Sequence, residues 1–281
     1  MSRRWQQVRH QLRRNRPAQF SLFVLFIFVV AALCAGLSPY DPDRMALGAR
    51  TLPPDAAHWF GTDEYGRDYF TRALYGGQIS LMVGFLAMLF STLIGTVVGT
   101  VSGYFGGWLD NLMMRAVDIL MAIPAFFLLL VVNAYLKPGV DNIILIISLL
   151  TWMNMSRLVR AEALSVKERE YVLYARASGE HPLRIIVRHI IPGVLPTIIV
   201  AATLNIASAI LMESTLSFLG LGVQAPAASW GSMLNNAQSY IGEASWLAMF
   251  PGILILLTVF SFNVLGDVFR TAFEPGANRD E

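Results

Sequence analysis

The sequence carries little charge. Only 14% of its 281 residues are Asp, Glu, Lys or Arg, whereas 55% are hydrophobic. Soluble globular domains usually carry about 25% charged residues, so this composition excludes a disordered chain and argues against a soluble one. The 21 Lys and Arg residues nearly balance the 19 Asp and Glu residues, and a net charge of +2 gives no indication of a nucleic-acid partner.

Cysteine, histidine and lysine are scarce as well. The single cysteine, Cys34, excludes an intramolecular disulfide and a multi-cysteine metal site. The histidines fall in loops or at the edges of apolar runs, with no pair spaced to share a metal ion. They are His10, His58, His181 and His189. The two lysines, Lys137 and Lys167, are followed by Pro and Glu, so the Gly-Lys-Ser/Thr of a Walker A loop is missing. No Ser/His or Asp/Asp constellation of an intramembrane hydrolase lies in the apolar runs. We therefore predict that this chain is not an enzyme.

Long uncharged apolar runs are abundant. A helix needs about 20 mostly apolar residues to cross the hydrocarbon core of a bilayer, and six candidates follow one another. They cover residues 20–37, 79–101, 119–136, 143–156, 190–212 and 244–266. The fourth is short, but Arg157 and Arg160 at its end can snorkel to the interface. The sequence therefore predicts an all-α membrane protein with six transmembrane helices.

The distribution of Lys and Arg predicts the orientation. Six arginines precede the first run, and the residues after it, Ser38 to Asp41, do not form a cleavage site, so we expect a retained anchor. With the amino terminus inside, the cytoplasmic segments hold 15 Lys and Arg and the outer segments five. This bias agrees with the positive-inside rule. It predicts a cytoplasmic segment 1–19, a six-span domain 20–269 with an inner loop 157–191, and a cytoplasmic tail 270–281.

Few polar groups lie in or beside the spans. Arg115 and Asp118, three residues apart, predict a local ion pair at the inner interface. Glu213 ends the fifth span on the outer side, where it faces either a pathway or the lipid headgroups. Neutral polar residues inside spans either line a route or hydrogen-bond neighbouring helices. They are Asn133, Asn205, Ser208 and Asn263. Nothing resembles a proton relay, which argues against a secondary transporter.

A stripe of glycines marks the second span. Gly95, Gly99 and Gly103 are spaced by four residues and share one helix face. Because they carry no side chain, another backbone can approach closely. The pattern predicts tight helix packing, against a helix of this chain or of another.

The inner loop 157–191 predicts a helical hairpin. Ser165 and Glu168 have the spacing of a capping box, a helix-compatible run follows to residue 178, and Gly179 takes the favoured position just beyond a helix. Pro182 suits the first turn of a second helix. A DNA-reading motif is disfavoured because the second helix runs through apolar residues into a span. The loop is either a solvated basic loop or a docking surface for a cytoplasmic partner.

Several motifs resemble one family. YARASG at 174–179, with Pro192 thirteen residues after Gly179, resembles the EAA loop of ABC importer permeases, although Leu173 stands where that family has Glu. Five further motifs occur in the same order. They are FGTDEYGRD at 60–68, GYFGGWLD at 103–110, LSFLGLG at 216–222, SWG at 229–231 and FNVLGD at 262–267. Across residues 17–275 the chain resembles the C-type permease of dipeptide/oligopeptide importers.

The resemblance implies an ABC importer type I permease fold in the bacterial cytoplasmic membrane, with both termini cytoplasmic. It implies a homologous B-type permease, two cytoplasmic ATPases that bind ATP and Mg, and an extracytoplasmic solute-binding protein as partners, and no cofactor in this chain. Residues expected to couple to the ATPases are Glu170, Tyr171, Val172, Ala175, Arg176, Ala177, Gly179 and Arg184.

The expected cargo is a di- or oligopeptide. Members of this family also carry glutathione, nickel chelates or opines, and these cargos remain alternatives. A secondary transporter that works alone and a membrane scaffold are two further classes. Glu213 and the four neutral polar residues named above are the candidates for the substrate pathway.

Overall fold

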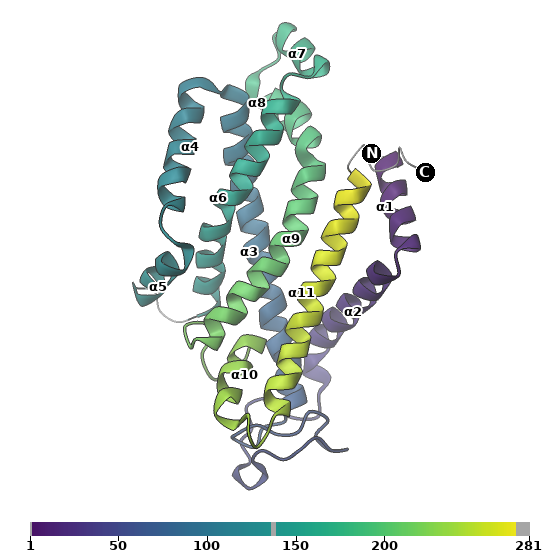
Figure 1. The fold of residues 1–281 in the computed structure, drawn as a ribbon, viewed down its shortest axis with the longest axis vertical. Helices are drawn as coiled ribbons and strands as arrows, with labels where there is room; N and C mark the ends of the chain where they lie inside the picture. Colours follow the sequence, from purple (N-terminus) through teal and green to yellow (C-terminus); the bar gives the residue numbers. More distant parts are fainter. Residues whose placement is uncertain (1, 136–138, 274–281) are drawn as a thin grey trace.

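The computed structural model describes residues 2–135 and 139–273, and it is a bundle of long helices (Figure 1). Within these residues, five helices are long and apolar enough to cross a membrane, with Pro182–Phe218 counted as one. The five are α2 (Arg16–Leu33), α3 (Tyr69–Phe105), α6 (Val140–Val166), α9 (Ile191–Phe218) with the short segments before it, and α11 (Trp246–Phe273). Their outward side chains are apolar: Phe23, Phe26 and Leu256 are more than 60% exposed.

Helix α3 is the centre of the bundle, packed along α6 on one side and α9 on the other, while α11 contacts α9 and α2. The glycine stripe faces α6 of this same chain. A Cβ atom on Gly99 would lie 2.5 Å from the carbonyl oxygen of Ser156, and one on Gly95 would lie 2.6 Å from Cβ of Met155. The glycine spacing does not identify the helix that packs against the stripe. The structure shows that this helix is α6.

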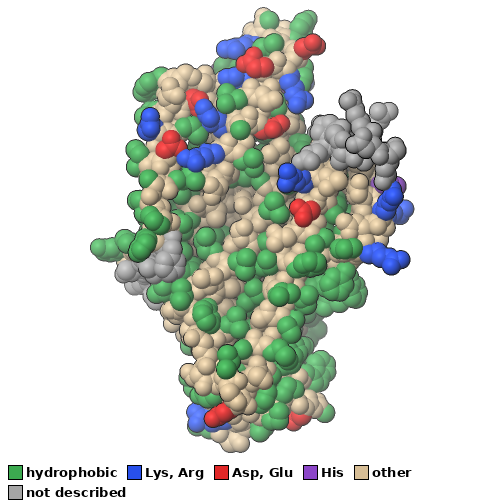
Figure 2. Space-filling model, in the orientation of Figure 1, with side chains coloured by type: hydrophobic (Ala, Val, Ile, Leu, Met, Phe, Trp, Pro, Cys, Tyr) green, Lys and Arg blue, Asp and Glu red, His purple; other side chains and the backbone are tan. Residues whose placement is uncertain are grey.

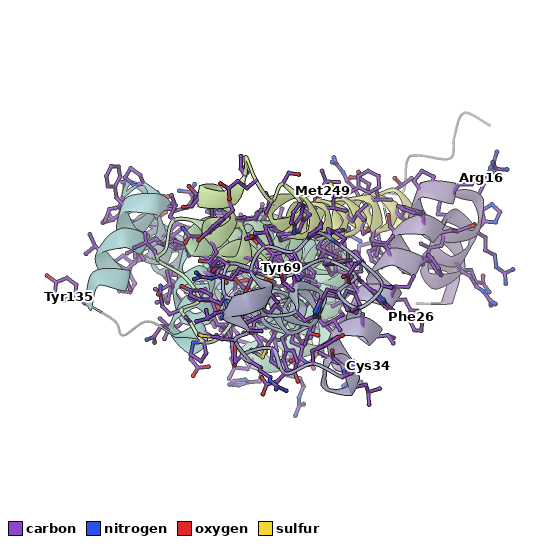
Figure 3. All side chains as sticks on the ribbon, turned by 90° about the horizontal axis from the view of Figure 1, so that it is seen from below. Arg16, Phe26, Cys34, Tyr69, Tyr135 and Met249 are labelled. Atoms are coloured by element: carbon purple, nitrogen blue, oxygen red, sulfur yellow. The ribbon has the colours of Figure 1, made fainter. Side chains whose placement is uncertain are left out.

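The third predicted span differs from the expectation. Residues 119–136 do not form one helix: α4 (Gly107–Met121) ends before Pro124, and α5 (Ala125–Tyr135) begins after it. Pro124 lacks an N–H and suits the start of a helix better than its interior. Its carbonyl accepts hydrogen bonds from the amides of Phe127 and Leu128, at 2.9 and 3.2 Å. Both helices stand beside the main bundle (Figure 1), and Tyr135 lies at its far edge in the view of Figure 3.

The amino terminus is more ordered than a plain basic segment. Helix α1 (Ser2–Arg14) precedes α2 and lies beside α11. Asn15 separates α1 from α2 and caps the latter, because its side-chain oxygen accepts a hydrogen bond from the amide of Ala18 at 3.2 Å. The helix of the first span therefore begins at Arg16, four residues before the predicted apolar run, and it ends at Leu33.

The two ends of the bundle differ. Helix α7 (Glu170–Ala177) projects from the end toward which α1 and the last turns of α11 also lie, whereas segment 38–68 and α10 (Trp230–Ala237) cover the opposite end (Figure 1). Charged side chains gather toward the two ends, and hydrophobic ones cover the middle of the visible face (Figure 2). This banding is what a bilayer requires.

Segment 38–68 is held by the FGTDEYGRD motif. Asp63 Oδ1 accepts the amides of Tyr65 and Arg67 at 2.9 Å, and Asp63 Oδ2 lies 2.6 Å from Arg67 Nε. Asp68 caps α3 by accepting the amide of Thr71 at 2.8 Å. At Gly66, φ is +74° and the carbonyl of Ala46 leaves no room for a side chain. Tyr69, central in Figure 3, donates its hydroxyl to the Leu247 carbonyl at 2.6 Å.

Candidate functional site

The loop between α6 and α9 folds into a helical hairpin. After α7, Gly179 has φ +78°, the Glu180 amide donates to the Ala175 carbonyl and the Gly179 amide to the Arg176 carbonyl, both at 3.1 Å. These two bonds form a Schellman motif. Pro182 then begins α8 (Pro182–Ile185), a π-helical turn η3 (Ile186–Ile190) follows, and α9 continues the chain. The predicted Gly turn and the Pro start are both present.

The predicted capping box is wrong. Ser165 lies in the last turn of α6, and α7 begins after Arg169 without a side-chain cap. Helix α6 runs on because Val159, Ala163 and Val166 continue its buried face at i, i+4 and i+7. The local signal at Ser165 was overridden by packing.

One face of the hairpin is buried and the other is open. Val172, Ala175 and Ile185 are buried against the ends of α6 and α9. His189 Nε2 lies 3.1 Å from Glu180 Oε2, which ties the turn after α7 to the base of α9. On the open face, Tyr174 is 78% exposed. Large apolar side chains at a projecting end are typical of a docking surface.

The predicted coupling residues divide between these faces. Val172 and Ala175 are buried and anchor α7, so they have no free surface for a partner. The other six are exposed and lie on the open side or in the turns: Glu170, Tyr171, Arg176, Ala177, Gly179 and Arg184. Sequence reasoning missed the apolar contribution of Leu183 and Val187, which are 60% and 64% exposed.

The neutral polar candidates are spread over three helices. Asn205 is half-buried and Ser208 exposed on α9, while Asn263 is exposed on α11. These two helices run antiparallel, and Gly266 meets Leu204, so Asn263 and Ser208 lie at similar depth. Asn133 belongs to α5, but its side chain lies outside the described residues.

Glu213 does not face a pathway or headgroups. Its side chain is 0% exposed. Glu213 Oε2 accepts the hydroxyl of Ser80 at 2.9 Å, and Glu213 Oε1 accepts that of Ser217 at 2.7 Å. The expectation failed because a helix end does not reveal what covers it, and here α3 and α10 enclose the carboxyl group.

Two aspartates of α4 form ion pairs with arginines of α6. Asp118 bonds to Arg157 of α6, so the predicted pair between Arg115 and Asp118 is wrong. A second pair was not predicted from the sequence: Arg160 Nε and Nη2 donate to the two oxygens of Asp110 at 2.5 and 2.6 Å. Asp110 lies in the first turn of α4 and precedes its apolar run. Because Asp110 also accepts the hydroxyl of Ser102, it connects α3, α4 and α6.

Comparison with known proteins finds two matching family models. Residues 91–279 match the family of binding-protein-dependent transport system inner membrane components. Residues 3–54 match the N-terminal TM domain of oligopeptide transport permease C.

Named relatives cover nearly the whole chain. The dipeptide transport system permease protein DppC of Bacillus subtilis is 43% identical over 96% of this chain and 85% of its own length. The oligopeptide transport system permease protein OppC of the same organism is 38% identical over 96% of this chain and 89% of its own length. The probable D,D-dipeptide transport system permease protein DdpC of Escherichia coli is 40% identical over 92% and 86%.

A solved structure shares the fold. A chain of the inward-facing MetNI methionine ABC transporter superposes with a TM-score of 0.61 at 20% identity, over 72% of this chain and 97% of that one. The fold is therefore that of an ABC importer permease. From the family match and the relatives together, the chain belongs to the binding-protein-dependent transport system inner membrane components.

Proposed function

We propose that this chain is a transmembrane permease subunit of an ATP-driven importer for di- or oligopeptides. The relatives named above are permeases for dipeptides and oligopeptides, which favours peptides over glutathione, nickel chelates or opines. The observation that carries the proposal is the projecting hairpin, which is open on one face and packed by the other onto two spanning helices.

The hairpin gives the chain a way to use ATP hydrolysed elsewhere. A cytoplasmic ATPase that binds the open face would push on α7, and Val172 and Ile185 would pass the motion to α6 and α9, because close-packed interiors transmit displacement. Glu170, Tyr171, Arg176 and Arg184 would make the contacts. ATP and Mg would be bound by the partner subunits, and this chain needs no cofactor of its own.

In this proposal the chain crosses the bacterial inner membrane six times, with the broken segment α4–α5 as one crossing. The end that holds the termini and α7 is cytoplasmic, in line with the Lys and Arg bias. Residues 20–269 form the permease domain, with the basic α1 segment and the tail 270–281 on the inner side. A homologous B-type permease completes the route, and a solute-binding protein delivers the peptide to the outer end.

Half of the route would be built from polar side chains that remain accessible in this chain. Asn205, Ser208 and Asn263 are the proposed lining residues, with Asn133 as a further candidate. They offer neutral hydrogen-bonding groups and no charge, as suits a passage that must release peptides of varied sequence. Lipid covers the remaining apolar surface.

Reconstitution tests the proposal. The chain, with its second permease, ATPases and binding protein, is placed in liposomes, and uptake of a labelled dipeptide is compared with uptake of glutathione and a nickel chelate. We expect ATP-dependent uptake of the dipeptide alone. Uptake of another solute in its place would overturn the cargo, and uptake by this chain without ATPases would overturn the class.

A variant of the hairpin tests whether its open face binds the ATPase subunits. Tyr174→Asp places a charge at the most exposed aromatic side chain of the hairpin and should release the ATPase subunits from the purified complex. Tyr174→Phe keeps the ring and is the matched control. If both variants retain the ATPases and full uptake, Tyr174 is not part of the docking surface.

A further inference from the structure

Two motifs meet at Glu213 and have no part in the hairpin. LSFLGLG supplies Ser217, whose hydroxyl donates to Glu213 Oε1 at 2.7 Å. SWG supplies Trp230, whose amide donates to Ser80 Oγ beside the same carboxyl group. Ser80 of α3 donates to the same group at 2.9 Å, and Ser214 lies 3.4 Å from it. A buried acidic side chain in a membrane helix is costly unless it is paired or hydrogen-bonded. The hydroxyls of Ser80, Ser214 and Ser217 provide those bonds.

Two of the serines also bind the backbone of the segment that follows α9. The amide of Val223 donates to Ser217 Oγ at 3.0 Å, and the amide of Trp230 donates to Ser80 Oγ at 3.2 Å. Each hydroxyl accepts from the outer backbone and donates to Glu213. The carboxyl group therefore holds both ends of segment 223–230 through one intervening side chain each.

The end of this segment and the start of α10 pack tightly against the bundle. A Cβ atom on Gly231 would lie 2.5 Å from Cα of Ser214. The indole of Trp230 lies against Gly77, and its Nε1 donates to the Ala73 carbonyl at 2.9 Å. The turn and α10 thus form a fitted layer over the outer ends of α3 and α9, which we name the outer cap (residues 219–237).

We propose that Glu213 is a positioning residue that holds the outer cap in place, so that the outer end of the route closes against a fixed surface. Its full burial argues against contact with the peptide. An acidic side chain suits this role because its two oxygens accept several hydroxyl bonds at once. The transport part of this inference rests on the proposed function.

The test uses the complete transporter in liposomes, with Cys34 replaced by Ser. A spin label at Asn236→Cys, an exposed position of α10, reports how firmly the cap is held, and a label at Asn111→Cys on α4 serves as the remote reference. In Glu213→Leu the label at 236 should become mobile while that at 111 does not change. Peptide uptake per ATP hydrolysed should fall at least about fivefold, the effect of roughly one lost hydrogen bond.

Milder variants keep the inference falsifiable if Glu213→Leu does not assemble. Ser217→Ala removes one relay and should loosen the cap partly, whereas Glu213→Gln should keep an immobile label and uptake within about twofold, because the amide still bonds to the serines. Thr203→Val is the matched control, since the Thr203 hydroxyl bonds only its own helix at the Ile199 carbonyl. It should behave as the wild type.

Two results would overturn the inference. One is an immobile label at 236 in both Glu213→Leu and Ser217→Ala. The other is a Glu213→Gln protein with a fixed cap that has lost uptake of peptides with a free amino terminus but not of amino-blocked ones, which would assign the charge to substrate binding. The label measurement needs no transport, so a wild-type protein that takes up no peptide would refute the proposed function and leave this test intact.

Discussion

Gly99→Ala adds a single methyl group at the closest approach of α3 and α6. That Cβ atom would lie 2.5 Å from the carbonyl oxygen of Ser156, 2.8 Å from Cβ of Val159 and 2.9 Å from the amide nitrogen of Arg160. Ordinary contact begins near 3.4 Å, so α6 must move by about 0.9 Å at Ser156. Two of the three atoms belong to the backbone, so a change of side-chain rotamer cannot relieve the contact.

The expected cost follows from this geometry. Overpacking of this kind typically costs about 1–3 kcal/mol, against a gain of up to about 1 kcal/mol from replacing a helical Gly by Ala. Gly252→Ala in α11 is the matched control, because Gly252 is also helical but nothing lies within 4 Å of its Cβ position. It receives the propensity gain without the clash.

Thermal unfolding of the purified complex measures the difference. We expect Gly99→Ala to lower Tm by several degrees, since about 1 kcal/mol shifts Tm by roughly 2–4 °C in a chain of this size class, and Gly252→Ala to leave Tm unchanged or raise it. Equal Tm values for the two variants would refute the reasoning that α3 and α6 are in backbone contact at Gly99.

Three further outcomes are expected. Asp110→Asn should lower Tm, because it breaks the ion pair in which Arg160 of α6 donates to both oxygens of Asp110 of α4. An unchanged Tm would count against a contribution of this ion pair to stability. Gly179→Val should strain a residue at φ +78° by about 1–2 kcal/mol and uncouple ATP hydrolysis from uptake, while Gly179→Asn retains coupling, and normal uptake by the Val variant would exclude a coupling role. Reporters fused after Gly179 and after Gln224 should read cytoplasmic and outside; an outside signal at Gly179 would reverse the topology.

Much of this protein follows from its sequence because a bilayer leaves the backbone few choices. Apolar runs of sufficient length must become helices, since hydrocarbon offers no other hydrogen-bond partner. Helices α3 and α6 contain the whole of the runs predicted for them, and α2, α9 and α11 cover most of theirs. The turn after α7 was readable for a similar reason: φ near +78° suits Gly179, and Pro182 suits a helix start. The break before α5 was missed because a hydropathy count does not register that Pro124 lacks an N–H.

Tertiary structure decided everything that depends on which surfaces meet. The glycine stripe predicted a close helix contact, but only the packed structure identifies α6 as the helix in contact. Asp118 had a basic neighbour three residues away and pairs instead with Arg157, 39 positions along the chain. Glu213 stands at a helix end that the sequence places near water. In the structure its carboxyl group is instead hydrogen-bonded by the hydroxyl of Ser80, which is 133 positions away. Side-chain spacing along one helix carries no information about distant residues, and at these three positions a neighbouring helix determined the outcome.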